Sequence, residues 1–175
     1  MRINISVLKN VHLKTPRFIL RDLKTEDVGP HYLNWFQDPE TQKHISASAH
    51  SQEIENIRQY VLEKKNDALT MFLGIFTQEG KHIGNIKFNM NSPQNDYTIM
   101  GILIGDSEFR GQGVAPEALS VSGEYLRRHG FKKIYLGVKK DHTAAIRAYE
   151  KIGFYIVLDS PIPMSSDGQV MVWVL

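Results

Sequence analysis

The stretch that decides the fold is ILIGDSEFRGQGVAPE, residues 102–117. Its first residues form an apolar run typical of a buried strand, and an amphipathic helix pattern begins at Gly113. Gly111 and Gly113 leave the intervening backbone N–H groups free of side-chain obstruction, and a helix N-terminus adds about half a positive charge. We therefore expect a cradle for a diphosphate here, to which Arg110 can add a forked cationic group.

Two better-known phosphate-binding loops do not match this stretch. A Walker loop has Lys-Ser or Lys-Thr after its last glycine, whereas Val114 and Ala115 follow Gly113. A dinucleotide-binding loop needs a third glycine and an acidic residue after the next strand. The plainer interpretation is that the glycines only turn the chain and that Arg110 is solvated. The elements on either side of the stretch are needed to choose between this interpretation and a diphosphate cradle.

Apolar periodicity predicts strands on both sides of this stretch. Three of them are joined by short connectors rich in turn residues, which favours an antiparallel meander, and two strand–helix–strand steps follow. Strands are expected at Ile3–Val7, Arg17–Leu23, Thr70–Thr77, His82–Met90, Tyr97–Ile104, Lys133–Val138, Phe154–Leu158 and Val170–Leu175. Helices are expected from Thr25 to about Asp38, from a Ser51 cap to about Lys65, from Gly113 to His129, and from an Asp141 cap to Lys151.

Two motifs in the second half of the chain resemble the GNAT superfamily of N-acetyltransferases. Residues 110–115 fit the family pattern Q/R-x-x-G-x-G/A, and residues 142–154 resemble its N-x-x-A/S-x-x-x-Y-x-x-x-G-F segment, with His142 in place of the usual Asn. The resemblance extends from about Arg17 to the C-terminus. It implies a single α+β domain with a mixed, mostly antiparallel central sheet of about seven strands, four helices, and a cleft where the fourth and fifth strands splay apart.

The same resemblance implies acetyl-CoA as cosubstrate in that cleft. The pantetheine arm would pair, as an added pseudo-strand, with the backbone of residues 102–104, and the diphosphate would lie on residues 110–115. His142 takes the position whose family Asn hydrogen-bonds pantetheine. The cofactor-binding residues implied are Ile102, Leu103, Ile104, Arg110, Gly111, Gln112, Gly113, Val114, Ala115 and His142, and Lys139, Lys140, Arg147 and Lys151 are placed to meet the 3′-phosphate.

Tyr149 is the residue that the resemblance implies for catalysis. Because a tyrosine titrates near 10 and a thiol near 8.5, roughly, a phenol can protonate the departing thiolate at a modest cost. A helical tyrosine more often simply packs, here with Ile146 and Ile152, and both roles can hold together. The general base is missing from its usual place, because Ile99 stands where many relatives carry Glu. Other groups that could take a proton are Asp38, Glu40, His44, His50 and Tyr97.

Composition narrows the class of protein further. The chain has 175 residues, 42% hydrophobic and 23% charged, which is typical of one folded domain over residues 1–175. A net charge of +2 offers no general attraction to nucleic acid or anionic lipid. The absence of cysteine excludes disulfides and a cysteinyl acyl-enzyme, and the 7 histidines show no metal-ligand spacing, so no metal is expected. No apolar run suits a membrane helix or a signal peptide, so a cytoplasmic location is expected.

The acceptor is expected between the first two helices, Thr25–Leu62, and the loop Asp159–Gln169, as the resemblance implies. The chain is similar there to the branch that includes ribosomal-protein N-terminal, spermidine and amino-sugar N-acetyltransferases. Two functions stay open. One is an N-acetyltransferase in which the primary amine of a small metabolite, an amino sugar or a peptide N-terminus attacks acetyl-CoA directly. The other is a non-catalytic acyl-CoA-binding or sensing module. Residues 1–13 could add an N-terminal edge strand, which would favour a homodimer.

Overall fold

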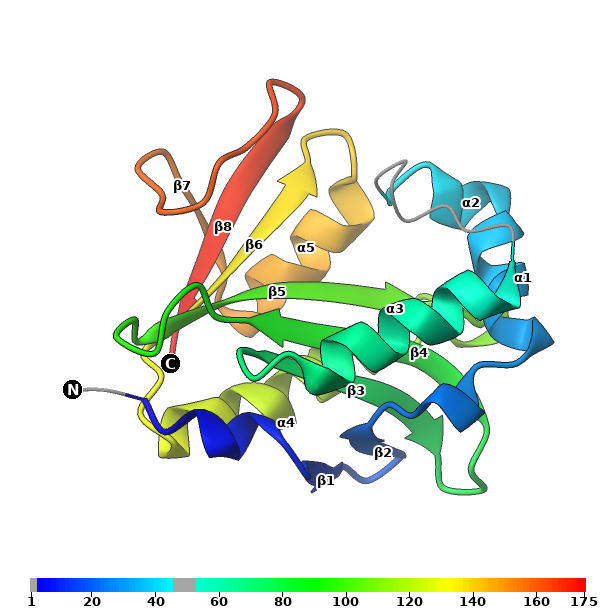
Figure 1. Ribbon diagram of the computed structural model, residues 1–175. Helices are drawn as coiled ribbons and strands as arrows, with labels where there is room; N and C mark the ends of the chain where they lie inside the picture. The colour runs from blue at the N-terminus through cyan, green and yellow to red at the C-terminus, as the bar shows by residue number, and fades with distance from the viewer. Residues whose placement is uncertain (1–2, 46–52) are drawn as a thin grey trace.

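The computed structural model describes residues 3–45 and 53–175 and is built on one eight-stranded sheet (Figure 1). The strand order is β1-β2-β3-β4-β5-β6-β8-β7, and every neighbouring pair is antiparallel except β5 and β6, which run parallel. The predicted α+β class and mixed sheet are confirmed. The strands are β1 (His12–Lys14), β2 (Phe18–Asp22), β3 (Thr70–Thr77), β4 (His82–Asn89), β5 (Tyr97–Ile104), β6 (Lys133–Lys139), β7 (Tyr155–Val157) and β8 (Gly168–Val174).

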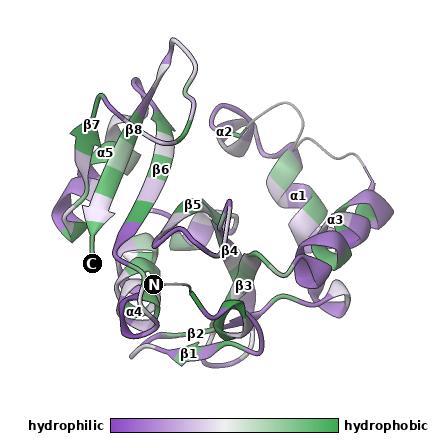
Figure 2. Ribbon diagram, turned by 60° about the vertical axis from the view of Figure 1, so that its left-hand side comes forward, coloured by the Kyte–Doolittle hydropathy of each residue, from purple (hydrophilic) through white to green (hydrophobic). Residues whose placement is uncertain are grey.

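Helices cover both faces of the sheet. Figure 2 shows α1 and α3 on one side of the molecule and β6, β7, β8 and α5 on the other, with α2 between them. Within the described residues, no helix combines the length and the apolar character needed to cross a membrane. The α-helices are α1 (Pro30–Gln37), α2 (Pro39–Gln42), α3 (Ile54–Asn66), α4 (Val114–Arg128) and α5 (Thr143–Ile152).

Two apolar clusters hold these helices on the sheet. Ala118, Leu119 and Leu126 repeat at helical spacing along α4, and all three are fully buried against the strands. On the opposite face, Trp35 of α1 and Ile57 of α3 bury a second cluster with residues of β3. The sheet is therefore enclosed on both faces at its centre, and the clusters fix the helices that flank the cleft described below.

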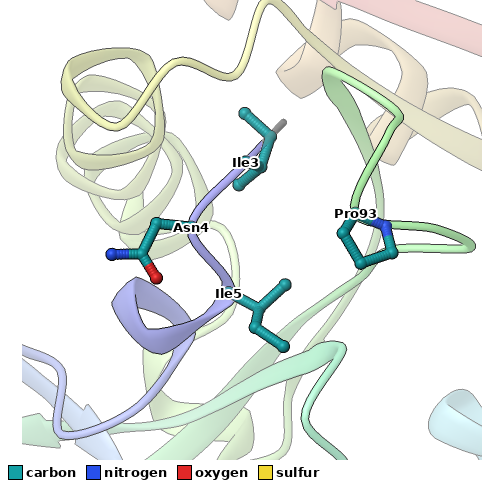
Figure 3. Close-up of a pocket in the computed structure, with 4 residues that line it drawn as sticks. All are labelled: Ile3, Asn4, Ile5 and Pro93. Carbon is teal, nitrogen blue, oxygen red and sulfur yellow. The ribbon is translucent and has the colours of Figure 1, made fainter. Parts of the chain in front are cut away.

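The prediction of a strand at Ile3–Val7 is wrong. The side chain of Asn4 accepts a hydrogen bond from the N–H of Ser6, which caps a short 3-10 helix over Ile5–Leu8 (η1). The N-terminal edge strand is instead β1, which pairs with β2. A hollow of about 310 Å³ lies beside this segment. Figure 3 shows the four residues that line it, Ile3, Asn4, Ile5 and Pro93. These side chains carry no ionisable group, so the hollow has no catalytic chemistry.

The first predicted helix is divided in the structure. Thr25–Asp27 form a 3-10 helix (η2), and α1 begins only at Pro30, whose missing N–H and fixed φ suit a first helical turn. Asp38 follows α1 and caps α2 by accepting a hydrogen bond from the N–H of Thr41. The chain therefore turns sharply at Asp38 toward the end of β5.

Smaller differences concern element ends. The second predicted helix begins at Ile54 in the structure, and its expected cap, Ser51, lies outside the described residues. The last strand begins at Gly168, two residues earlier than expected, because it pairs along the whole of β6.

The predicted splay between the fourth and fifth strands is present between β5 and β6. The two strands pair only from Tyr97–Ile99 to Lys133–Tyr135, whereas β5 stays paired with β4 as far as Ile104. A cavity of about 1540 Å³ opens where β6 departs. The parallel pair thus gives the cleft one wall that carries unpaired backbone.

Candidate active site

The free edge of β5 forms one wall of the cleft. The N–H of Gly105 donates to the carbonyl of Ile83 in β4. Residues 105, 103 and 101 therefore direct their backbone N–H and C=O groups toward β4. By alternation, the N–H and C=O groups of Ile102 and Ile104 face the cleft, where β6 no longer pairs. Leu103 lines the cleft as well, but with its side chain, because its backbone belongs to the ladder with β4. The expectation that Leu103 offers backbone groups to a ligand is therefore corrected.

The loop after β5 presents a row of unpaired amides. Residues 110–113 form a turn, and among the described residues no backbone hydrogen bond of ordinary geometry is found for the N–H groups of residues 111–115. Gly111 and Gly113 have φ values of 70° and 75°, a left-handed conformation that side chains disfavour. A Cβ added at Gly111 would meet nothing within 4 Å, so the space beside this residue is open. These amides lie at the N-terminus of α4, where the sequence predicts an anion cradle.

A salt bridge holds this loop from its outer side. The guanidinium of Arg17 lies 2.7 Å from the carboxylate of Glu117 in the first turn of α4. Its Nη1 also donates to the carbonyl of Gln112 at 3.0 Å. The carbonyl of Gln112 points toward Arg17. The neighbouring backbone N–H groups therefore point toward the other side of the loop. Gln112 therefore contributes to the cradle with its backbone, while its side chain donates to the carbonyl of Glu108.

The side chain of Arg110 does not point into this cradle. Its Nε donates to the carbonyl of Ile104 at 3.0 Å, and its Nη2 donates to that of Gly105 at 2.9 Å. Nη1 donates to Asp38 Oδ2 at 2.8 Å, and Nη2 also reaches Thr41 Oγ1 at 2.9 Å. With its donors used in this way, the guanidinium joins β5 to the turn between α1 and α2. Its binding of a diphosphate, expected from the sequence, stays a prediction.

Tyr149 lies on the α5 wall of the cleft. Its ring packs against Phe154, with ring centroids 5.7 Å apart, which satisfies the packing role expected from the sequence. Burial alone raises the pKa of Tyr149 to about 12, so the phenol keeps its proton at neutral pH. Because the residue also lines the cavity, the buried ring and an available O–H group coexist in the structure.

His142 stands at the N-cap of α5 and stacks on His44. The two rings are 3.5 Å apart at their centroids and inclined by only 5°. Burial, followed by the nearby His44, holds the pKa of His142 below its usual value, so the imidazole is neutral and can donate or accept a hydrogen bond. Lys139 Nζ also donates to the carbonyl of Lys43 at 2.9 Å. These contacts link the end of α2 to the α5 side of the cleft.

The structure gives no strong general base among the expected candidates. Ile99 packs in an apolar cluster, and Tyr97 lies in the same cluster, outside the cleft. Hydrogen bonds from Thr41 and Arg110 hold the pKa of the Asp38 carboxyl below its usual range. Glu40 lines the cleft, but a hydrogen bond from Lys43 lowers its pKa as well. The remaining candidates are His44, which lines the cleft, and His50, which lies outside the described residues.

Cations gather at the β6 and α5 end of the cleft. Lys139, Arg147 and Lys151 line it there, next to the phosphate cradle. Lys140 does not, because its Nζ donates to the carbonyl of Ser166 at 3.0 Å. Three of the four cations expected near a 3′-phosphate are therefore brought together.

The two regions expected to hold an acceptor both line the cleft. Met164 and Ser165, from the loop between β7 and β8, lie at the β6 side, because Met164 is next to Gly137. The opposite end of the cleft is lined by residues of α1, α3, β3 and β4. Sequence reasoning missed Asn85 and Lys87 of β4, although their alternation with Gly84, Ile86 and Phe88 places them on one face of the strand. The other residues that line this end include Tyr32, Phe36, Asn56, Ile57, Tyr60 and Phe72, from α1, α3 and β3.

Four of the described histidines lie in two pairs, His31 with His82 and His44 with His142. Within residues 3–45 and 53–175, no group of three His, Asp or Glu side chains is arranged to hold a metal ion.

A sheet that splays at its parallel pair, next to an amide-lined loop and a half-buried tyrosine, defines an acetyltransferase fold of the GNAT type. The chain belongs to this family, because residues 17–155 match the family model described as Acetyltransferase (GNAT) domain.

Known relatives agree with this assignment. Mycothiol acetyltransferase of Corynebacterium glutamicum (strain R) is 30% identical over 84 residues, which are 47% of this chain and 28% of that protein. The chain spans about half the length, or less, of the curated relatives that it matches.

Solved structures show the same fold at low sequence identity. RimL, a ribosomal L7/L12 alpha-N-protein acetyltransferase in complex with coenzyme A, has a TM-score of 0.77 at 16% identity, covering 94% of this chain and 98% of that one. Spermidine N-acetyltransferase from Vibrio cholerae, in complex with CoA and spermine, has a TM-score of 0.75 at 17% identity, covering 91% and 96%.

Proposed function

We propose that the chain is an acetyl-CoA-dependent N-acetyltransferase in which a primary amine attacks the acetyl thioester directly. The observation that carries the proposal is the row of unpaired amides at residues 111–115, set at the end of a strand whose free edge leads to Tyr149. Bound acetyl-CoA would supply the electrophilic thioester and a diphosphate. Membership of the GNAT family supports this function for the cleft.

The residues present fit such a ligand along its length. The cradle amides and the dipole of α4 favour a diphosphate, and Lys139, Arg147 and Lys151 favour a further phosphate. The backbone of Ile102 can pair with an extended amide-containing arm. The carbonyl of Ile104 is already occupied by Arg110, so it contributes nothing to that pairing.

Tyr149 holds the proton that the leaving thiolate needs. Its raised pKa, about 12, makes it a weaker acid than an exposed phenol. Burial also raises the pKa of a thiol, so the difference between donor and acceptor is smaller than this value alone suggests. The N–H of Ile104, directed into the cleft, is placed to polarise a carbonyl oxygen. No residue of this chain needs to form a covalent intermediate.

A second candidate function is a non-catalytic acyl-CoA-binding or sensing module. It is favoured by Ile99, an apolar side chain where a base would be useful, and by the engagement of Asp38 and Glu40 in other hydrogen bonds. Such a module would keep the cradle and the free edge of β5 but would not need Tyr149.

A screen of primary amines with detection of free thiol separates the two functions. The proposal predicts thiol release that depends on both acetyl-CoA and an amine. Thermal stabilisation by acetyl-CoA without thiol release on any amine would support the sensing module instead. Analytical ultracentrifugation of the same preparation tests the homodimer, and fractionation of the source cells tests the cytoplasmic location; both stay predictions.

A further inference from the structure

The acceptor end of the cleft carries hydrogen-bond donors on β4. Asn85 and Lys87 are two residues apart on that strand, so both side chains leave the same face of the sheet. Lys87 stands opposite Gly101 of β5, where an added Cβ would meet nothing within 4 Å. Because no side chain from β5 covers it, Lys87 is open to the cavity that both residues line.

The orientation of the Asn85 amide follows from its neighbours. His82 Nε2 lies 3.1 Å from the carbonyl of Gly84 and 2.8 Å from Asn85 Oδ1. A carbonyl can only accept, so Nε2 carries the hydrogen, and the group that shares this donor must be the oxygen of Asn85. The amide nitrogen is thereby turned away from His82. It is buried and has no partner within the described residues.

The charge of Lys87 is also uncompensated. Its Nζ donates to the phenol of Tyr60 at 2.6 Å, and among the described residues no carboxylate lies within ion-pair distance of it. Of the described residues that line the cleft, Glu40 is the one carboxylate, and it already pairs with Lys43. This end of the cleft is therefore suited to an anion and poorly suited to a polycation.

The missing base restricts the amine in a second way. Among the described residues, no carboxylate lies beside β5 to take a proton, which favours an acceptor that arrives largely unprotonated. At pH 7.5, roughly a third of a peptide-type α-amine with a pKa near 7.8 is neutral, against about one thousandth of an alkyl amine with a pKa near 10.4. The difference favours an α-amine by more than two orders of magnitude.

We propose that the acceptor is an anionic peptide-type α-amine, whose carboxylate is bound by Lys87 and whose neighbouring carbonyl oxygen accepts from Asn85 Nδ2. The inference rests on the proposed acetyltransferase function and names the substrate class of the same site. Tyr60 orients the ammonium group of Lys87, and His82 orients the amide of Asn85. Neither of these two supporting residues is required to touch the substrate.

The test compares isosteric acceptors that differ in charge. Ala-Asp amide and Ala-Asn amide form one pair, Asp-Ala amide and Asn-Ala amide form a second, and spermidine represents polycations. We expect the wild-type protein to use the better acidic peptide with at least tenfold higher kcat/KM than its neutral partner. Lys87→Met should abolish this preference by raising KM, and Lys87→Glu should reverse it. Equal kcat/KM within both pairs, or a preference that survives Lys87→Met, overturns the proposal.

Two controls keep the outcomes distinct. Lys14→Glu makes the same charge change on β1, away from the cleft, and should leave the preference intact. Calorimetry should give the same acetyl-CoA affinity for the wild-type protein and both Lys87 variants. If no amine releases thiol, the acetyltransferase function fails. Calorimetric binding of the two peptide pairs to the CoA-loaded protein then still decides the inference, because only the acidic peptides should bind and Lys87→Met should remove that binding.

Discussion

Nη1 of Arg110, in the motif that follows β5, lies 2.8 Å from Oδ2 of Asp38, the residue that caps α2. The same guanidinium donates to the carbonyls of Ile104 and Gly105. One side chain thus joins β5 to the turn between α1 and α2. The arginine of the motif positions the two sides of the cleft relative to each other, while the proposed anion contacts come from the backbone of the motif.

Replacing Arg110 by Lys should lower stability more than it lowers cofactor affinity. Lysine keeps one charge but cannot reproduce the forked set of hydrogen bonds, so we expect a loss of about 1–3 kcal/mol in the free energy of unfolding. Asp38→Asn should cost a similar amount, and the double variant should lose less than the sum because the two residues share one interaction. Urea unfolding and acetyl-CoA calorimetry on the three variants measure both quantities. A large loss of acetyl-CoA affinity at unchanged stability would contradict this account and indicate that the Arg110 guanidinium binds a phosphate.

Tyr149→Phe should lower kcat by about a hundredfold or more, the usual contribution of a positioned acid. The ring still fills its place against Phe154, so the acetyl-CoA dissociation constant and the unfolding midpoint should stay close to those of the wild-type protein. Steady-state kinetics and calorimetry on one preparation check this. Equal turnover by the two proteins would remove the proton-donor role from Tyr149.

Stability should fall on mild acidification because of His82. Burial lowers the pKa of His82 to about 4 from 6.5, so the native state keeps this imidazole neutral while the unfolded chain binds a proton below 6.5. The free energy of unfolding should therefore decrease as pH falls from 6.5 toward 4, by up to about 1.4 kcal/mol per pH unit. In His82→Gln this part of the slope should be absent. Parallel pH profiles for the two proteins, from urea unfolding, would contradict the assignment.

Much of the fold could be predicted from local sequence patterns. The continuous apolar run in Thr70–Thr77 indicates a buried strand, the helical spacing of Ala118, Leu119 and Leu126 indicates a helix with one buried face, and the structure confirms both elements. The strand predicted at Ile3–Val7 failed because a single side-chain acceptor, on Asn4, competes with sheet pairing, and alternation alone does not record such a competitor.

The site could be predicted only at positions where the residue type indicates the backbone conformation. Gly111 and Gly113 mark left-handed positions, and such positions leave a direct trace. The role of Arg110 depends on Asp38, 72 residues away in sequence, and the donors on β4 depend on which face of the sheet α1 and α3 cover. Contacts of that kind are set by tertiary packing, so residue type and spacing do not reveal them.

The most direct test of the account is calorimetric titration of acetyl-CoA into Gly113→Val beside a matched control. Gly113 has φ +75°, and a branched side chain there strains the loop and disrupts its amides. Gly80→Val is the control, because Gly80 has φ +89° in the turn between β3 and β4, where an added Cβ meets nothing within 4 Å. We expect affinity to fall at least a hundredfold in Gly113→Val and to stay unchanged in Gly80→Val, with similar losses of stability. Unchanged affinity in a folded Gly113→Val protein would contradict the cradle and, with it, the proposed function.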